Sequence, residues 1–370
     1  MDALRRSSVA SCFHFSLLSF THSRSLKFFR IILILCVLVT AALYWFISRS
    51  PVIIEDTRYG VTSVLDDSLL QVVIKQCSKM NKLCYTVADF LDPTNQRAIR
   101  QLNTDHNEDP ESSLYLRNPQ GKSPTDADTR LWSVDHSRIA VEYIAAMIAA
   151  PFALSSLNLE KGVDVNGNVL VVGLGGGSLD MFLTTKFPKL VIKVTEFDET
   201  VISLAQRWFG VVNNSNHQII HTDGTDFINE FKPTEHRFDT VLIDACGLDG
   251  TVICPSQKFF HPSVLERLSS VLLSSNGSVI FNVLLTDSSG NLEERLFLVR
   301  EVDERLRKQF KACILVQLKN MLNVVVVCAP FAKDMSSFRS FFKSSLTKVW
   351  HKLRFNFDFE TPTVTELQSS

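Results

Sequence analysis

The sequence has almost no net charge. Its 370 residues include 38 lysines and arginines against 39 aspartates and glutamates, which gives a formal net charge of −1 at pH 7. A protein that binds nucleic acid through its overall charge needs an excess of positive side chains, so we expect no nucleic-acid partner. The hydrophobic content of 45% is enough for a sizeable core, and the length leaves room for two domains.

Metal-binding motifs are also missing from the sequence. The eight cysteines show none of the paired spacings that are typical of zinc sites. Histidines and carboxylates form no recognisable ligand set either. We therefore expect no metal cofactor.

A glycine-rich turn follows an apolar run within residues 168–177, NVLVVGLGGG. Gly173, Gly175 and Gly177 let the chain reverse, let backbone N–H groups approach a ligand and let the next helix pack on the strand. This is how a parallel strand enters a nucleotide-binding turn. About 20 residues further on, a second apolar stretch ends at Glu196, where a carboxylate would hold the hydroxyls of a ribose.

Three more β-like runs continue the pattern. One ends at Asp223 and Gly224, the next ends at Asp244, and a third spans residues 278–283. Helical stretches separate the runs, which predicts right-handed βαβ units and a doubly wound parallel sheet of Rossmann-like type. Ligands of such sheets bind beyond the carboxyl ends of the strands. We therefore predict that the glycine turn, Glu196, Asp223 and Asp244 form one site.

Two further strands follow a helix at residues 291–310, and the turn between them is short enough to require an antiparallel pair. Five parallel strands followed by an antiparallel hairpin make a seven-stranded α/β sheet of the class I S-adenosylmethionine-dependent methyltransferase type. No second mononucleotide-binding half follows, so NAD is the less favoured ligand.

Several motifs resemble those of a known family. They are VLVVGLGGGSL, TEFDETVISLAQRWFG, HTDGTDFI and the pair Cys254 and Pro255 after the fourth strand. The family is a group of eukaryotic methyltransferase-like proteins with a domain related to spermidine synthase, whose members methylate translation elongation factor 1 alpha on its N-terminal amine and on lysine. The resemblance covers roughly residues 130–330.

The resemblance implies S-adenosyl-L-methionine as the cofactor. It implies that Glu196 binds the ribose, that Asp223 binds the adenine, and that glycines line the cofactor, namely Gly173, Gly175, Gly177 and Gly224. It also implies a protein substrate, which the sequence does not identify. The oligomeric state stays open, and a dimer is compatible with the sequence.

The loop after the fourth strand departs from the pattern of spermidine synthases. Those enzymes carry a paired-aspartate motif, D-x-x-D-P, that grips amines, whereas this chain reads DACGLDGTVICP. Asp244 matches the first acid, Gly247 replaces the second, and Asp249 comes two positions late. Because a pair of acids is needed to hold a polyamine and take its proton, polyamine synthesis is disfavoured.

The sequence therefore predicts a methyltransferase that modifies an amine, either lysine or N-terminal, of a protein. Asp244 is the candidate catalytic residue, and Asp249 and His261 are weaker candidates. His136 fits a packing role better than a substrate channel. The alternatives are a spermidine-synthase-like aminopropyltransferase and an inactive nucleoside-binding pseudoenzyme.

An uncharged run of seventeen residues, IILILCVLVTAALYWFI, lies at 31–47. At about 1.5 Å per residue it is just long enough to cross a hydrocarbon core. A buried helix and a cleaved signal peptide are the alternatives. More positive residues precede the run than follow it, which predicts a single-pass type II protein of the endomembrane system with a lumenal catalytic domain. The cytosolic orientation is the alternative.

The predicted organisation has six parts. They are a cytosolic tail (1–30), a transmembrane signal anchor (31–48), a small β-hairpin subdomain (52–91), a flexible polar loop (92–130), the methyltransferase-like domain (131–330) and a basic, aromatic C-terminal tail (331–370). The polar, proline-containing composition of the fourth part is typical of loops. For the tail, a helix that closes the sheet edge is favoured over a membrane-surface helix.

Overall fold

The computed structural model describes the greater part of the chain after residue 67. The described residues are 68–92, 96–106, 109–232, 236–247, 251–285, 292–310, 312–318, 321–331, 335–355 and 363–365. All of them belong to one compact unit that begins at Thr62.

Among these residues, no helix is both long and apolar enough to cross a membrane. We therefore correct the predicted localisation: the described part of the chain provides no transmembrane helix, and the type II assignment with a lumenal catalytic domain is not retained. The run at 31–47, on which that assignment rested, lies outside the described residues.

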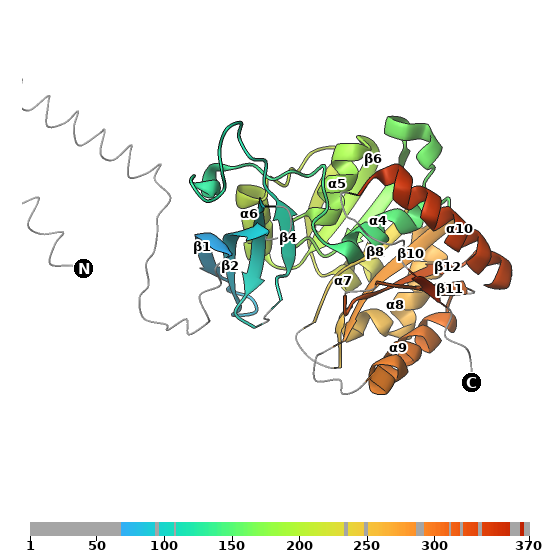
Figure 1. The fold of residues 1–370 in the computed structure, drawn as a ribbon. Helices are drawn as coiled ribbons and strands as arrows, with labels where there is room; N and C mark the ends of the chain where they lie inside the picture. The colour runs from blue at the N-terminus through green and yellow to red at the C-terminus, as the bar shows by residue number, and fades with distance from the viewer. Residues whose placement is uncertain are drawn as a thin grey trace, which may run out of the picture. The chain divides into compact units, whose positions relative to one another are not determined.

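A small antiparallel sheet comes first in the chain (Figure 1). Its four strands lie in sequence order and are β1 (Leu69–Cys77), β2 (Cys84–Asp92), β3 (Arg97–Thr104) and β4 (Ser112–Tyr115). The last two strands lie in the segment predicted as a flexible loop (92–130), so that prediction is wrong for residues 97–104 and 112–115. In β3 every second residue is buried, as expected of a strand with one face on a core.

A buried ion pair explains how so polar a segment forms a strand. Arg100 of β3 is 2% exposed and Asp89 of β2 is fully buried. The guanidinium donates to both carboxylate oxygens of Asp89, over 2.7 and 2.8 Å. A third bond, from Nη1 to the main-chain oxygen of Trp208 at 2.8 Å, ties the small sheet to the larger part of the molecule. Composition alone gives no sign of such a pairing.

The large sheet has the predicted core of five parallel strands and an antiparallel hairpin. Its order is β13-β11-β12-β10-β8-β5-β6-β7. The parallel strands are β5 (Asn166–Val172), β6 (Lys189–Glu196), β7 (His217–His221), β8 (Phe238–Ile243) and β10 (Leu273–Leu285), and the hairpin strands are β11 (Ala312–Gln317) and β12 (Val324–Ala329).

The sheet has nine strands rather than the predicted seven. β13 (Thr363–Thr365) adds to the edge strand β11, and β9 (Val252–Cys254) pairs with the end of β10. Both additions are only three residues long, too short for hydrophobic periodicity to reveal them.

Helices cover both faces of this sheet (Figure 1). The helices are α4 (Glu142–Ala153), α5 (Ser178–Lys186), α6 (Glu199–Trp208), α7 (Gly224–Glu230), α8 (Pro262–Arg267), α9 (Leu292–Arg307) and α10 (Met335–Leu353). Alternate residues of β5 enter two separate hydrophobic cores. Val169 and Val171 share a core with α4, α5, α6 and α10, whereas Leu170 and Val172 share the other core with α7, α8 and α9. Short 3-10 or π turns are η1 (Thr129–Leu131), η2 (Leu159–Asp164), η3 (Gln257–Phe260) and η4 (Leu268–Leu272).

The segment predicted as a C-terminal tail contains α10 and β13. Phe342 and Leu346 of α10 are fully buried, and the helix packs along α4. The favoured interpretation is a terminal helix that closes the sheet edge; the helix is present, but it packs along α4, and the edge of the sheet is formed by β13.

Candidate functional site

The glycine turn joins β5 to α5 in the conformation that the sequence predicts. Gly173 has a φ of +98°, and a Cβ atom there would lie 2.2 Å from the main-chain oxygen of Asp244. The first glycine is therefore required because β8 ends directly against the turn. Gly177, at a φ of 74°, is the residue that precedes α5 as its N-cap.

The small sheet also touches the glycine turn. The N–H of Gly176 donates to Oγ of Ser112, at the start of β4, over 2.9 Å. Gly175 has a φ of +50°, and a Cβ atom on it would lie 2.5 Å from the same Oγ. Ser112 therefore lies directly beside Gly175.

Glu196 ends β6 and lies beside the turn, as predicted. It is 7% exposed. Its Oε2 accepts from the N–H of Leu174 in the glycine turn at 3.1 Å, and its Oε1 accepts from the N–H of Asp198 at 2.9 Å. Burial raises the pKa of Glu196 above its usual value, although these backbone donors act in the opposite direction. The carboxylate thus joins the glycine turn to the loop that follows β6.

Asp223 and Gly224 lie at the start of α7. Asp223 caps the helix by accepting from the N–H and the Oγ1 of Thr225, at 2.8 and 2.7 Å, and its other oxygen is ion-paired with Lys258. Burial alone would raise the pKa of Asp223, but the bonds from Lys258 and Thr225 lower it overall. A Cβ atom at Gly224 would lie 2.3 Å from Val172 of β5, so only glycine lets the helix approach the strand this closely.

Asp244 follows β8 and is the centre of a polar network. Tyr143 of α4 donates its hydroxyl to Oδ2 at 3.3 Å, and Asn282 of β10 donates Nδ2 to Oδ1 at 2.7 Å. Asn323, next to β12, donates in turn to Oδ1 of Asn282 at 2.8 Å. Burial raises the pKa of Asp244 to about 6, against the opposing effect of the two direct donors.

A second carboxylate acts on this network. The negative charge of Glu111, next to β4, raises the pKa of both Asp244 and Tyr143. For Tyr143 burial is the larger cause, and the nearby Asp244 adds to it, so its pKa lies well above the usual value. Tyr143 therefore keeps its proton and stays a donor.

Sequence reasoning missed three residues of the network, Tyr143, Asn282 and Asn323. One usable signal was the register of the fourth and fifth strands. In the observed pairing Phe281 lies opposite Ile243, so the polar Asn282 comes level with Asp244. A lone asparagine in the apolar run SVIFNV is therefore a candidate partner for the carboxylate at the end of the neighbouring strand.

The weaker candidates do not enter the network. His261 is exposed, pairs with Ser263 at 2.8 Å and precedes α8. His136 is half-buried, and burial lowers its pKa; the packing role expected for it stays a prediction. Asp249 lies outside the described residues. No group of three or more metal-ligating side chains occurs within the part of the chain that the structure covers.

The loop after Asp244 is closed by a disulfide between Cys246 and Cys254. Within it, the N–H of Gly247 donates to the main-chain oxygen of Ile253 at 2.8 Å. Gly247 thus lies in a constrained loop without presenting the second carboxylate of the D-x-x-D pattern.

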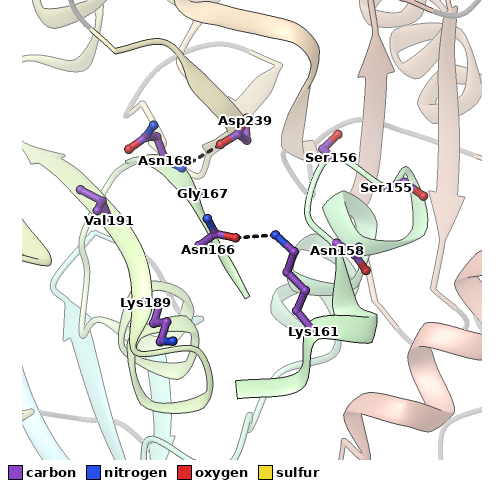
Figure 2. Close-up of a pocket in the computed structure, with 10 residues that line it drawn as sticks. All are labelled: Ser155, Ser156, Asn158, Lys161, Asn166, Gly167, Asn168, Lys189, Val191 and Asp239. Atoms are coloured by element: carbon purple, nitrogen blue, oxygen red, sulfur yellow. Dashed lines mark hydrogen bonds between the residues drawn. The ribbon is translucent and has the colours of Figure 1, made fainter. Parts of the chain in front are cut away.

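A separate pocket of about 500 Å³ lies at the amino ends of the parallel strands, whereas the candidate site lies at their carboxyl ends (Figure 2). Its lining residues come from the amino ends of β5, β6 and β8 and from the segment after α4: Ser155, Ser156, Asn158, Lys161, Asn166, Gly167, Asn168, Lys189, Val191 and Asp239. Its two lysines are already paired, Lys161 with Asn166 and Lys189 with Asp164. Because ligands of such sheets bind at the carboxyl edge, this pocket is not part of the candidate site.

Comparisons with known proteins support the fold and the resemblance. No family model matches the sequence. The chain is 33% identical over 159 residues to the eEF1A lysine and N-terminal methyltransferase of Bos taurus, and 29% identical over 168 residues to a homolog of that protein in Drosophila melanogaster. These matches cover 42% and 45% of this chain but only 22% and 24% of the relatives' own length. The predicted resemblance is therefore confirmed for part of the chain.

The similarity in fold to one solved structure covers a larger part of the chain than these sequence matches do. A probable spermidine synthase from Corynebacterium glutamicum superposes with a TM-score of 0.52 at 13% identity, covering 80% of this chain and 99% of that one. The molecule thus has an α/β class I methyltransferase-like fold with a mixed sheet and a separate small antiparallel sheet.

Proposed function

We propose that this protein is an S-adenosyl-L-methionine-dependent methyltransferase that modifies an amine of a protein. The proposal is carried by one observation: the glycine turn and Glu196, which would bind the methyl donor, lie beside Asp244, which would face the methyl acceptor, at the carboxyl ends of the strands. Glu196 is hydrogen-bonded to the glycine turn, and Asp244 follows β8 directly against Gly173 of that turn. The sequence similarity to eEF1A methyltransferases supports the same conclusion.

The residues at the glycine turn are compatible with S-adenosyl-L-methionine. The glycine turn offers backbone beside a buried carboxylate, and in this fold a carboxylate at the end of the second strand holds ribose hydroxyls. We assign the ribose to Glu196, the adenine to Asp223, and the lining of the cofactor to Gly173, Gly175, Gly177 and Gly224. When bound, the cofactor supplies an electrophilic methyl group on a sulfonium.

The acceptor side is assigned to Asp244. With a pKa of about 6, its carboxylate is ionised at neutral pH and can accept a proton from an amine. Tyr143 and Asn282 fix the two oxygens, which leaves the carboxylate in one orientation. A protonated amine has no lone pair, so removal of its proton is the step that this residue would assist.

The substrate is proposed to be a protein, through a lysine or N-terminal amine. The two relatives named above are described as acting on eEF1A, which makes eEF1A the first acceptor to test. The negative charges of Glu111 and Asp244 would favour an amine that arrives as a cation.

An aminopropyl transferase is the second candidate, because the fold also resembles that of a probable spermidine synthase. Against it, Gly247 stands where the second acid of the amine-gripping pair would be. A pseudoenzyme that binds nucleoside without turnover is the third candidate.

One assay separates the three candidates. The full chain is incubated either with labelled S-adenosylmethionine and purified eEF1A or a cell protein extract, or with decarboxylated S-adenosylmethionine and putrescine. We expect label on protein and no spermidine above background. Spermidine formation would favour the aminopropyl transferase, and binding without transfer to any acceptor would favour the pseudoenzyme.

A further inference from the structure

The turn between β1 and β2 reaches the loop that carries the ribose carboxylate. A disulfide between Cys77 and Cys84 closes this turn at its base. From the turn, Nδ2 of Asn81 donates to Oδ2 of Asp198 over 3.2 Å. The hydroxyl of Tyr85, the second residue of β2, donates to the same oxygen over 3.0 Å. Two donors of the small sheet therefore converge on one carboxylate oxygen.

Asp198 passes this contact on to the candidate cofactor site. It is fully buried and lies two residues after Glu196. Its own N–H donates to Oε1 of Glu196 at 2.9 Å, and its Oδ1 caps α6 by accepting from the N–H of Thr200 at 2.9 Å. Since Glu196 also accepts from Leu174, hydrogen bonds connect Tyr85 to the glycine turn through Asp198 and Glu196.

The chemistry of the connection requires both donors. A buried carboxylate is costly unless hydrogen bonds compensate its charge. Tyr85 is 5% exposed, and its pKa is raised by burial first and then by the charge of Asp198. It therefore remains a phenol, which donates to Asp198 and accepts from Nδ2 of Asn81 over 3.1 Å. Loss of this donor would leave the charge of Asp198 compensated by fewer hydrogen bonds, those from Asn81 and Thr200, and would weaken its hold on the backbone beside Glu196.

We propose that Tyr85 and Asn81 are positioning residues for the cofactor, which hold the ribose-binding carboxylate of Glu196 through Asp198. The small antiparallel sheet is then a component of the cofactor site. This inference rests on the proposed function, because it assumes that Glu196 binds the ribose.

The first test compares two tyrosines of the small sheet in the full chain. Tyr85 and Tyr115 are each 5% exposed and each donates its hydroxyl to an aspartate, Asp198 or Asp92. Calorimetry with S-adenosylhomocysteine should show that Tyr85→Phe raises Kd by about tenfold, the scale of one lost hydrogen bond. Tyr115→Phe should stay within about twofold of the wild type. Equal effects of the two changes would overturn the inference.

A double-mutant cycle distinguishes positioning from general destabilisation. Glu196→Ala should weaken binding by at least about tenfold. If Tyr85 acts through Glu196, adding Tyr85→Phe to Glu196→Ala should weaken binding by less than about twofold more. Additive losses of affinity would show that Tyr85 does not act through Asp198 and Glu196, and they would leave the proposed function in place. A wild-type chain that does not bind the ligand would remove the proposed function, and the inference with it.

Discussion

Asp244 illustrates how one residue acquires its chemistry from its neighbours. Its position at the end of the fourth strand was predictable, because the strand pattern stops there. Its hydrogen bond from Tyr143 was not, because Tyr143 lies about 100 residues away in the sequence and no periodicity links the two. The same holds for Asn323, which lies about 80 residues away and acts through Asn282. Burial and these donors together set a pKa of about 6, high enough for a base that operates near neutral pH.

The raised pKa of Asp244 predicts a pH dependence of stability. The folded protein holds this proton up to a pH of about 6, whereas the ordinary value for the unfolded chain is 3.8. The folded state therefore binds more protons between these values, and its free energy of unfolding should fall as the pH rises from about 4 to about 6. Urea unfolding of the wild type and of Asp244→Asn at several pH values measures this. If the difference in free energy of unfolding between the two proteins is the same throughout this pH range, the raised pKa of Asp244 is contradicted.

At the scale of elements, the five parallel strands and the hairpin could be predicted from the sequence because each is an apolar run bounded by turn residues. β3 could not, because its buried Arg100 pairs with Asp89 of β2 where such reasoning looks for an apolar residue. β4 could not, because it is only four residues long. The same limit applied to the glycine turn. Its strand and helix were predictable, but the approach of β4 through Ser112 depends on a tertiary contact.

The contact of Ser112 with the glycine turn predicts unequal effects of two glycine substitutions. Gly175 and Gly121 both have a positive φ, so alanine at either position costs about 1–2 kcal/mol of strain. A Cβ atom at Gly175 would also meet Ser112, whereas nothing lies within 4 Å of one at Gly121. Gly175→Ala should lower the melting temperature more than Gly121→Ala does. Partial recovery is expected in the double variant with Ser112→Gly, and equal losses from the two alanines would contradict the contact.

At the scale of the whole molecule, the small sheet is joined to the large one by buried polar groups. Arg100 bonds the main chain at Trp208, and Tyr85 and Asn81 bond Asp198. The sequence predicted a subdomain ahead of the nucleotide fold, but it could not predict this attachment, because polar residues in short strands give no pairing signal. The matches to the eEF1A methyltransferase of Bos taurus and to its Drosophila melanogaster homolog cover 42% and 45% of the chain.

Arg100 should therefore contribute strongly to global stability. Arg100→Leu leaves the carboxylate of Asp89 buried without its partner, and such changes cost about 3–5 kcal/mol. Arg117 is the control: its side chain is 59% exposed and lies 3.6 Å from Asp135, so Arg117→Leu should cost less than about 1 kcal/mol. Chemical unfolding measures both free energies. Similar losses would show that the buried pair does not hold the small sheet in place.

The glycine turn and Glu196 are proposed to hold a methyl donor, and Asp244 is proposed to serve the acceptor amine. The most direct measurement is transfer of labelled methyl groups from S-adenosylmethionine to eEF1A or to the proteins of a cell extract, by the wild type and by Asp244→Asn. We predict that the variant keeps its affinity for S-adenosylhomocysteine but transfers methyl groups at least about a hundredfold more slowly, the contribution expected of a positioned base. Equal rates for the two proteins, or no transfer by the wild type, would contradict the account.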